Sequence, residues 1–291
     1  MPNLKEIRNR ITSVGSTMQI TSAMKMVSAA KLKRAQDAIT QMRPYAEKLQ
    51  EILGNLTASL DISENALAAA RPANNVLIIA ITSNRGLCGG FNNNIIKRVN
   101  LAITEEYANA NVSLLTLGKK ARDAFKRSDM YFDITGTGIA EDIFADLSFG
   151  NVSVVAEFAM KAFLEKKFDK VVVIYNSFIN AASQEVKEEQ LLPIVPTEQS
   201  DNTQAGDYIF EPSKEEIVEE LIPKTLKIQL FKALLDSNAS EHGARMTAMH
   251  KATDNAKELQ RSLKLSYNKA RQAAITNEIL EIVGGAEALN G

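Results

Sequence analysis

The residue types that most often carry chemistry are few in this sequence and lie far apart. The single cysteine, Cys88, lies in the stretch SNRGLCGG, whereas both histidines, His242 and His250, lie near the other end of the chain. A cysteine nucleophile needs a neighbouring base, and two helical histidines that bind zinc are usually part of an HExxH motif. The sequence offers neither arrangement, so we expect Cys88 to be a small buried residue in a reducing compartment.

The glycine-rich stretch GLCGG follows an apolar run, as many phosphate-binding turns do. It has neither the GxGxxG pattern nor the lysine-serine ending of a P-loop, and a tight turn between a strand and a helix explains its glycines. Four glutamates, Glu188, Glu189, Glu215 and Glu216, are expected to be solvated and not to form an acid–base pair. We therefore predict no catalytic residue, no cofactor and no metal site in this chain.

The N-terminal residues carry a heptad pattern instead of a catalytic one. Steps of three and four from Leu4 to Leu60 reach 17 positions, of which 14 are apolar. The three exceptions, Thr21, Lys25 and Ser28, are consecutive members of the pattern. The spacing predicts a helix over 1–57 with Asn3 as its N-cap and with Pro44 on the outer face.

A second heptad pattern occupies the C-terminal part of the chain, where we predict a helix over 213–288. Its expected seam contains mostly small residues, which allow a partner helix to approach closely. The expected seam positions are Ala252, Ala256, Leu259, Leu263, Ser266, Ala270, Ala273, Asn277, Leu280 and Gly284. We expect the two helices to pair antiparallel and the longer C-terminal helix to extend beyond its partner.

Positive charge gathers on both predicted helices. Residues 1–36 carry seven Lys/Arg and one acidic residue, and residues 245–271 carry seven and two. If the helices pair, these blocks can form one positive collar that includes Lys25, Lys31, Lys33, Arg34, Arg245 and Lys251. In such a pair, Arg245, Met246 and Met249 would lie opposite the polar interruption, whose side chains we expect to turn outward.

The middle of the chain has a different pattern. Apolar runs at 76–82, 112–118 and 170–178 alternate with helical segments, and 184–194 alternates like an antiparallel edge strand. The fold class expected is thus α/β: a long antiparallel coiled coil of the terminal helices plus a small Rossmann-like α/β domain over 76–200. The longest apolar run, VLIIAI, is too short to cross a bilayer, and the chain begins without a signal peptide.

Two general functions fit these features. A basic helix that leads into a coiled coil also occurs in zipper proteins that bind DNA, but there the basic region precedes the seam, whereas here the seam begins at Leu4. A coiled-coil adaptor with a folded insert is the other alternative.

Several longer stretches resemble one known family. KEIRNRITSVGSTMQITSAMKMVSAAKL, RPYA, TSNRGLCGGFN, ARMTAMHKATDNA and YNKARQAAITNEILEIVGGAEAL resemble the gamma subunits of F-type ATP synthases, in the expected order. The family often has an aspartate where this chain has Asn84. The chain has no regulatory cysteine pair and no transit peptide, so the resemblance is to the bacterial members.

The resemblance implies a rotor subunit of the central stalk that has no nucleotide site. It implies alpha and beta subunits, an epsilon subunit and the c-ring as partners, and no nucleic acid. The membrane would be reached only through the c-ring, on the cytoplasmic face of the bacterial cell membrane. The resemblance places partner contacts at Met24, Lys25, Arg245, Arg271, Gln272, Thr276 and Glu278.

Overall fold

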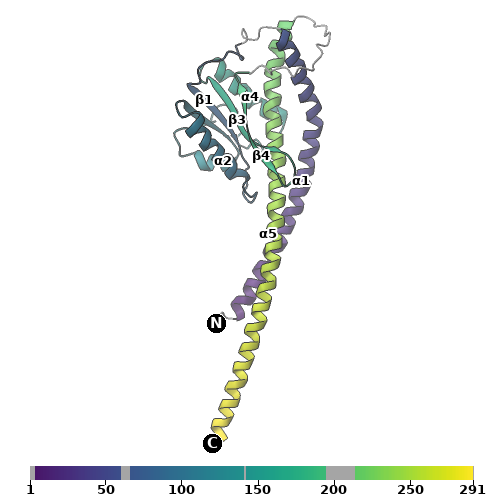
Figure 1. Ribbon diagram of the computed structural model, residues 1–291, viewed down its shortest axis with the longest axis vertical. Helices are drawn as coiled ribbons and strands as arrows, with labels where there is room; N and C mark the ends of the chain where they lie inside the picture. The colour runs from purple at the N-terminus through teal and green to yellow at the C-terminus, as the bar shows by residue number, and fades with distance from the viewer. Residues whose placement is uncertain (1–3, 60–65, 141, 195–213, 291) are drawn as a thin grey trace. The chain divides into compact units, whose positions relative to one another are not determined.

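The computed structural model describes residues 4–59, 66–140, 142–194 and 214–290 (Figure 1). The predicted N-cap Asn3 and the last seam position, Leu60, lie outside these ranges. Two compact units share the chain: one combines residues up to Ser28 with residues from Met246 onward, and the other comprises Ala29–Arg245. Both long helices, α1 (Leu4–Ser59) and α5 (Lys214–Asn290), contribute to both units. The two units are therefore described separately.

The larger unit contains a four-stranded sheet in the order β2-β1-β3-β4. The strands are β1 (Asn75–Ile81), β2 (Asn111–Leu117), β3 (Lys170–Phe178) and β4 (Gln184–Leu192). The first three are parallel, and β4 is antiparallel to β3. All four strands and the antiparallel edge were predicted from the sequence. β1 lies between two neighbours and is buried on both faces, which explains its continuous apolar run.

Helices cover both faces of the sheet (Figure 1). α2 (Phe91–Leu101), its π-helical continuation Ala102–Glu106 and α3 (Lys119–Phe125) pack on one face through Ile95, Val99 and Phe125. α4 (Phe149–Leu164) and the first part of α5 pack on the other face through Phe163, Leu226 and Leu230. The α/β architecture with a Rossmann-like sheet is thus confirmed. Neither the short α3 nor the π-helical turn was predicted.

The smaller unit is an antiparallel pair of helical segments from the start of α1 and the end of α5. The hydroxyl of Thr253 donates a 2.8 Å hydrogen bond to that of Thr21, and Nζ of Lys25 lies 3.4 Å from Nδ1 of His250. Further along, a Cβ atom on Gly15 would lie 2.9 Å from Nε2 of Gln260. Residue numbers therefore fall on one helix as they rise on the other, which confirms the predicted antiparallel pairing.

The seam predicted for α1 is confirmed at every position whose side chain is described. Each of these residues from Leu4 to Leu49 is buried or half-buried, and Pro44 is exposed as expected. The seam predicted for α5 is wrong at Leu259 and Ser266, and its last three positions lie in the exposed end of the helix. The other five predicted positions are buried or half-buried: Ala252, Ala256, Leu263, Ala270 and Ala273. Leu259 is 51% exposed and Ser266 is exposed, whereas their neighbours Gln260 and Tyr267 are half-buried.

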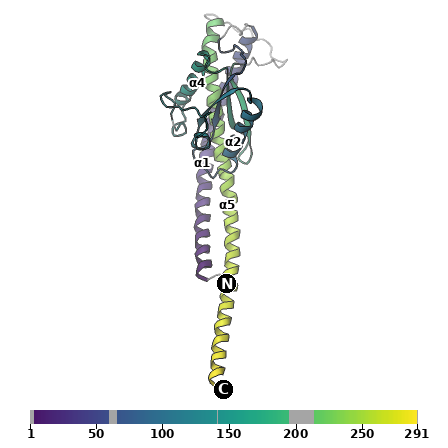
Figure 2. The ribbon, with the colours of Figure 1, turned by 90° about the vertical axis from the view of Figure 1, so that its left-hand side faces the viewer.

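The end of α5 has no partner helix within the smaller unit. Every residue from Ile275 to Ala286 is exposed. Figure 2 shows the yellow end of α5 continuing past the start of α1. The predicted extension of the longer helix is thus confirmed.

Candidate partner-binding surfaces

The polar interruption of the α1 seam lies inside the smaller unit, and two of its members do not turn outward as we expected. Thr21 is 9% exposed and Ser28 is 3% exposed. The Thr21 hydroxyl donates to the Met18 carbonyl and accepts from Thr253, and the Ser28 hydroxyl donates to the Met24 carbonyl. The hydroxyl of a serine or threonine can donate to a carbonyl of its own helix, so these residues remain buried in the seam.

The first candidate surface in this unit lies on α1 beside the interruption. Met24 and Lys25 are half-buried, and Lys25 is near His250, whose Nδ1 is 3.4 Å from a carboxylate oxygen of Asp254. Ile20 and Val27 share the face of Met24 at helical spacing and are 60% and 57% exposed. A short apolar stripe next to a positive charge is thus available to a partner.

The second candidate surface is the unpaired end of α5. Arg271, Gln272, Thr276 and Glu278 are all exposed there, and the Thr276 hydroxyl donates 2.9 Å to the Gln272 carbonyl of its own helix. Five large apolar side chains among and beyond them are 48–71% exposed: Ile275, Ile279, Leu280, Ile282 and Val283. A lone helix with this much exposed apolar surface indicates a surface that another protein covers.

Of the residues that the resemblance singles out, Arg245 lies in the larger unit and does not face outward. Its side chain is 9% exposed and forms an ion pair with Glu241, one turn earlier on α5. Its Nη2 also donates to the carbonyls of Arg85 (3.0 Å) and Gly86 (3.3 Å). The sequence alone did not indicate these contacts, because two of the three acceptors are backbone carbonyls far away in the chain.

The turn after β1 occupies the place where doubly wound sheets usually bind phosphate, namely the carboxyl ends of β1 and β3, where the strand order reverses. Here the backbone amide of Ser83 donates to the side-chain oxygen of Asn92, and Nδ2 of Asn92 lies 3.1 Å from Sγ of Cys88. Cys88 is 1% exposed, as predicted, and burial raises the pKa of its thiol. The polar groups of this turn thus bond to one another, to Arg245 and, through the side chain of Asn84, to Asp142 and the Lys119 amide.

Two of the four glutamates that we expected to be solvated are not. Glu188 on β4 forms an ion pair with Arg98 and accepts a 3.0 Å hydrogen bond from the Tyr107 hydroxyl. Burial raises the pKa of Glu188, and it also raises the pKa of Tyr107. Glu189 accepts a 2.6 Å hydrogen bond from Tyr175. The side chains of Glu215 and Glu216 lie outside the described residues.

α5 buries two further titratable groups in the larger unit. Burial raises the pKa of Asp236, and burial beside Arg245 and Lys31 lowers the pKa of His242 to about 4. The Nδ1 atom of His242 is buried without a hydrogen-bond partner.

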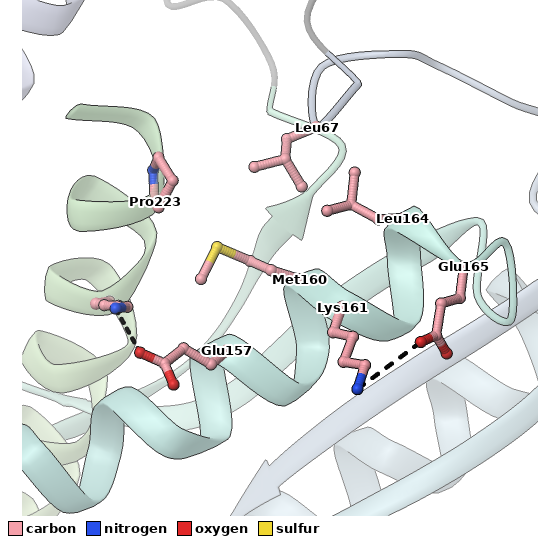
Figure 3. A pocket seen from close by; sticks show the side chains of 8 residues that line it. Leu67, Glu157, Met160, Lys161, Leu164, Glu165 and Pro223 are labelled. Atoms are coloured by element: carbon pink, nitrogen blue, oxygen red, sulfur yellow. Dashed lines mark hydrogen bonds and ion pairs between the residues drawn. The ribbon is translucent and has the colours of Figure 1, made fainter. Parts of the chain in front are cut away.

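A shallow hollow lies between α4, α5 and the loop at Leu67 (Figure 3). Leu67, Met160 and Pro223 provide its apolar floor. The charged groups at its rim are paired, because Lys227 binds Glu157 at 2.6 Å and Lys161 lies 4.0 Å from Glu165. Figure 3 shows no charged group turned toward the floor, and nothing in the lining points to a particular ligand.

Residues 4–59, 66–140, 142–194 and 214–290 contain no group of three or more His, Cys, Asp or Glu residues placed to hold a metal ion. The same ranges contain no helix that is long and apolar enough to cross a membrane.

Comparison with known proteins gives one consistent result. The model of the family described as ATP synthase matches residues 3–289. The ATP synthase gamma chains of Christiangramia forsetii and Flavobacterium johnsoniae are each 61% identical over 292 residues, with 100% of both chains covered.

Solved structures give the same fold. A chain from the mitochondrial ATP synthase of Euglena gracilis, in a structure of OSCP, F1 and the c-ring, matches with a TM-score of 0.65 at 22% identity, over 98% of this chain and 94% of that one. A chain from the central stalk and c-ring of the Tetrahymena thermophila enzyme matches with a TM-score of 0.56 at 25% identity, over 80% and 99%.

Proposed function

Since the chain belongs to the gamma-chain family of ATP synthases, we propose that it acts as the central-stalk rotor of such an enzyme and carries no catalytic site of its own. Rotation of a c-ring would turn this chain inside a hexamer of alpha and beta subunits, with an epsilon subunit beside it. ATP would be made or hydrolysed on the beta subunits. The adaptor alternative is not favoured, because the family match extends over almost the whole chain.

The observation that carries this proposal is the single helix at the end of α5. Ile275, Ile279 and Ile282 are among its exposed side chains. These aliphatic side chains offer little directional bonding, so a protein collar can surround them and still slide past. The partner contacts proposed at Arg271, Gln272, Thr276 and Glu278 would lie at the same level.

Coupling would then be mechanical. A rotor that presents different faces to otherwise equal sites binds each of them differently, and by linkage the occupancy of the sites biases the angle of the rotor. Met24 and Lys25 provide a second contact level, roughly 30 Å from Arg271 along the helix pair at 1.5 Å per residue. The chain would be peripheral, on the cytoplasmic face of a bacterial membrane, and would reach the membrane only through the c-ring.

Assembly with the catalytic subunits tests whether they surround the exposed end of α5. Replacing Ile275, Ile279 and Ile282 with Ser should reduce the yield of hexamer that co-purifies with this chain, because the apolar contact is lost. The matched control replaces Leu101 and Leu164, which are 44% and 49% exposed on the larger unit, with Ser. Equal recovery of alpha and beta subunits with all variants would contradict the proposed role of this surface.

A nucleotide-binding measurement tests the proposal that this chain has no catalytic site of its own. The purified chain should show no micromolar ATP binding by calorimetry, because the turn after β1 uses its polar groups internally. Saturable micromolar binding would contradict the proposed absence of a nucleotide site, and its loss in Asn92→Ala would indicate a phosphate site in this turn.

A further inference from the structure

The turn that follows β1 holds a bulky residue in a backbone conformation that such residues avoid. Leu87 has a φ of 64° and is 65% exposed. The left-handed region is costly for a residue with a branched side chain, and a residue stays there only when the surrounding structure fixes it. No packing of the Leu87 side chain can supply this restraint, because most of the side chain is in solvent. The restraint must come from the backbone around it.

Hydrogen bonds to the turn backbone come from two sources. Inside the turn, the Ser83 hydroxyl donates to the Arg85 carbonyl at 2.7 Å. From outside, Arg245 on α5 donates to the same carbonyl and to that of Gly86. The two carbonyls immediately before Leu87 are thus both held by one guanidinium group.

Arg245 is itself fixed in place. Its Nη1 donates to a carboxylate oxygen of Glu241, so the guanidinium is oriented from one side by the acid and binds the turn from the other. Two residues before Arg245, Gly243 lies against the β3–β4 turn, where an added Cβ would come within 3.1 Å of the Ala181 carbonyl oxygen. This second close contact shows that α5 meets the carboxyl edge of the sheet over one helical turn.

We propose that Arg245 is a positioning residue: it clamps the turn Asn84–Gly89 to α5 and thereby presents Leu87 as a fixed apolar tip. This role differs from the direct partner contact that the family resemblance implies for Arg245, since its donors are used inside the chain. Lysine cannot replace it, because one ammonium group cannot reproduce the planar fork that reaches two carbonyls and a carboxylate. The clamp consists of contacts within this chain and does not depend on the proposed function. Only its expected effect on coupling rests on the proposed rotor role.

Hydrogen exchange on the purified full-length chain tests the clamp without any partner present. The amides of Ser83 and Phe91 report on the turn, because they donate to Asn92 and to the Cys88 carbonyl at its two ends. In Arg245→Gln and in Arg245→Lys both amides should exchange about tenfold faster or more, because the charge-assisted bonds that hold the turn are lost. Arg127→Gln, which removes an exposed arginine from the same unit, is the matched control and should leave these amides unchanged. Unchanged exchange of β1 and α4 amides in every variant would show that the unit remains folded.

A milder variant covers the case in which the replacement of Arg245 unfolds the unit. Glu241→Gln keeps the guanidinium and weakens only its anchor, so exchange of the Ser83 and Phe91 amides should rise by a smaller factor, about threefold. Parent-like exchange of the turn in Glu241→Gln and in folded Arg245→Gln would overturn the clamp. Slow exchange in Arg245→Lys would show that the planar guanidinium group is not required.

The reconstituted enzyme separates positioning from direct charge contact. If the clamp serves coupling, the number of protons pumped per ATP hydrolysed should fall by a similar fraction, about twofold, in Arg245→Lys and Arg245→Gln. Full coupling in Arg245→Lys together with fast turn exchange would overturn the functional part of this proposal. Failure of the proposed rotor function would appear differently, as an absence of assembly in the parent chain.

Discussion

Leu87 shows how a single residue can store backbone strain on the surface of the larger unit. Its positive φ costs roughly 1–2 kcal/mol for an L-residue, while glycine would cost somewhat less than 1 kcal/mol in added chain entropy. Leu87→Gly should therefore raise the free energy of unfolding by about 0.5 kcal/mol, as measured by urea titration. Leu87→Ala is the control, because it removes the side chain but keeps the strain, and it should leave the stability nearly unchanged. A loss of stability in Leu87→Gly would mean that the side chain, and not the backbone, determines this turn.

His242 makes the stability of the larger unit depend on pH. Burial, Arg245 and Lys31 lower its pKa from the ordinary 6.5 to about 4, so the folded chain disfavours the protonated form. Between these values the unfolded chain binds a proton that the folded chain does not, and stability must fall as the pH is lowered from about 6.5 to 4. His242 is partly exposed, so we expect this contribution to be about 1–2 kcal/mol.

The pH experiment needs a difference measurement, since Asp236 and Glu188 titrate too and have raised pKa values. Carboxyl groups with raised pKa values act in the opposite direction, because they favour the folded state at low pH. Urea titrations of the parent and of His242→Gln at pH 7.5 and pH 4.5 isolate the histidine. The parent should lose about 1–2 kcal/mol more than the variant. An equal loss in both chains would show that the histidine does not contribute.

Arg245 shows where inference from sequence ends at the residue scale. Its charge and its place after a helical glycine are visible in GARM, and they are compatible with either an outward or an inward role. What decides between these roles is the approach of the Arg85 and Gly86 carbonyls, which depends on how the sheet turns meet α5. Backbone carbonyls have no sequence signature, so the contact could not be predicted.

At the scale of elements, the register of a helix could be predicted where its seam residues differ clearly from those of its other faces. It could not be predicted where small residues such as alanine occur on several faces. The α1 seam combines leucine, isoleucine and methionine with polar outer positions, and its register was correct. The α5 seam contains alanine on both candidate faces, at Ala273 and Ala274 for example, and Leu259 marked the wrong one. Short elements such as α3 and the π-helical turn after α2 contain too few residues to show a period.

The register of the helix pair gives an element-scale prediction. Leu263 is half-buried on the seam, whereas Leu259 is 51% exposed. Leu263→Ala should lower the free energy of unfolding of the smaller unit by about 1–2 kcal/mol, and Leu259→Ala by less than about 0.5 kcal/mol. Both substitutions remove the same atoms from the same helix, so propensity cancels between them. Circular dichroism of the purified variants during heating would measure the difference. A loss for Leu259→Ala as large as that for Leu263→Ala would mean that Leu259 packs on the seam as well, as the sequence pattern predicted.

At the scale of the whole molecule, the uneven distribution of charge remains the feature that neither unit explains. The net charge is −1, yet α1 carries Lys25, Lys31, Lys33 and Arg34, and α5 carries Lys251. Lys33 is paired with Asp37 at 2.8 Å, but both side chains are largely exposed. Arg245, which the charge pattern also suggested, is used inside the larger unit and is excluded from this set.

If the chain is a rotor as proposed, each of these five basic residues should attract acidic surfaces of the subunits around it. Each exposed ion pair contributes only about 0–1 kcal/mol, so no single residue should be essential, and salt should screen the set over about 8–10 Å. We expect the chain with all five replaced by Gln to fold and assemble, and the enzyme to hydrolyse ATP while pumping fewer protons per ATP. This loss should be largest at low ionic strength and should shrink as salt is added.

The matched control removes an equal positive charge from the α/β domain by replacing Lys97, Lys119, Lys120, Lys126 and Arg127 with Gln. Proton pumping and ATP hydrolysis, measured together in vesicles across a series of salt concentrations, give the comparison. If only the helix variant loses coupling, the position of the charge matters and its total does not. If the helix variant pumps like the parent at every salt concentration, the basic residues are solvated surface, and the contact at this level must depend on the apolar stripe of Ile20, Met24 and Val27.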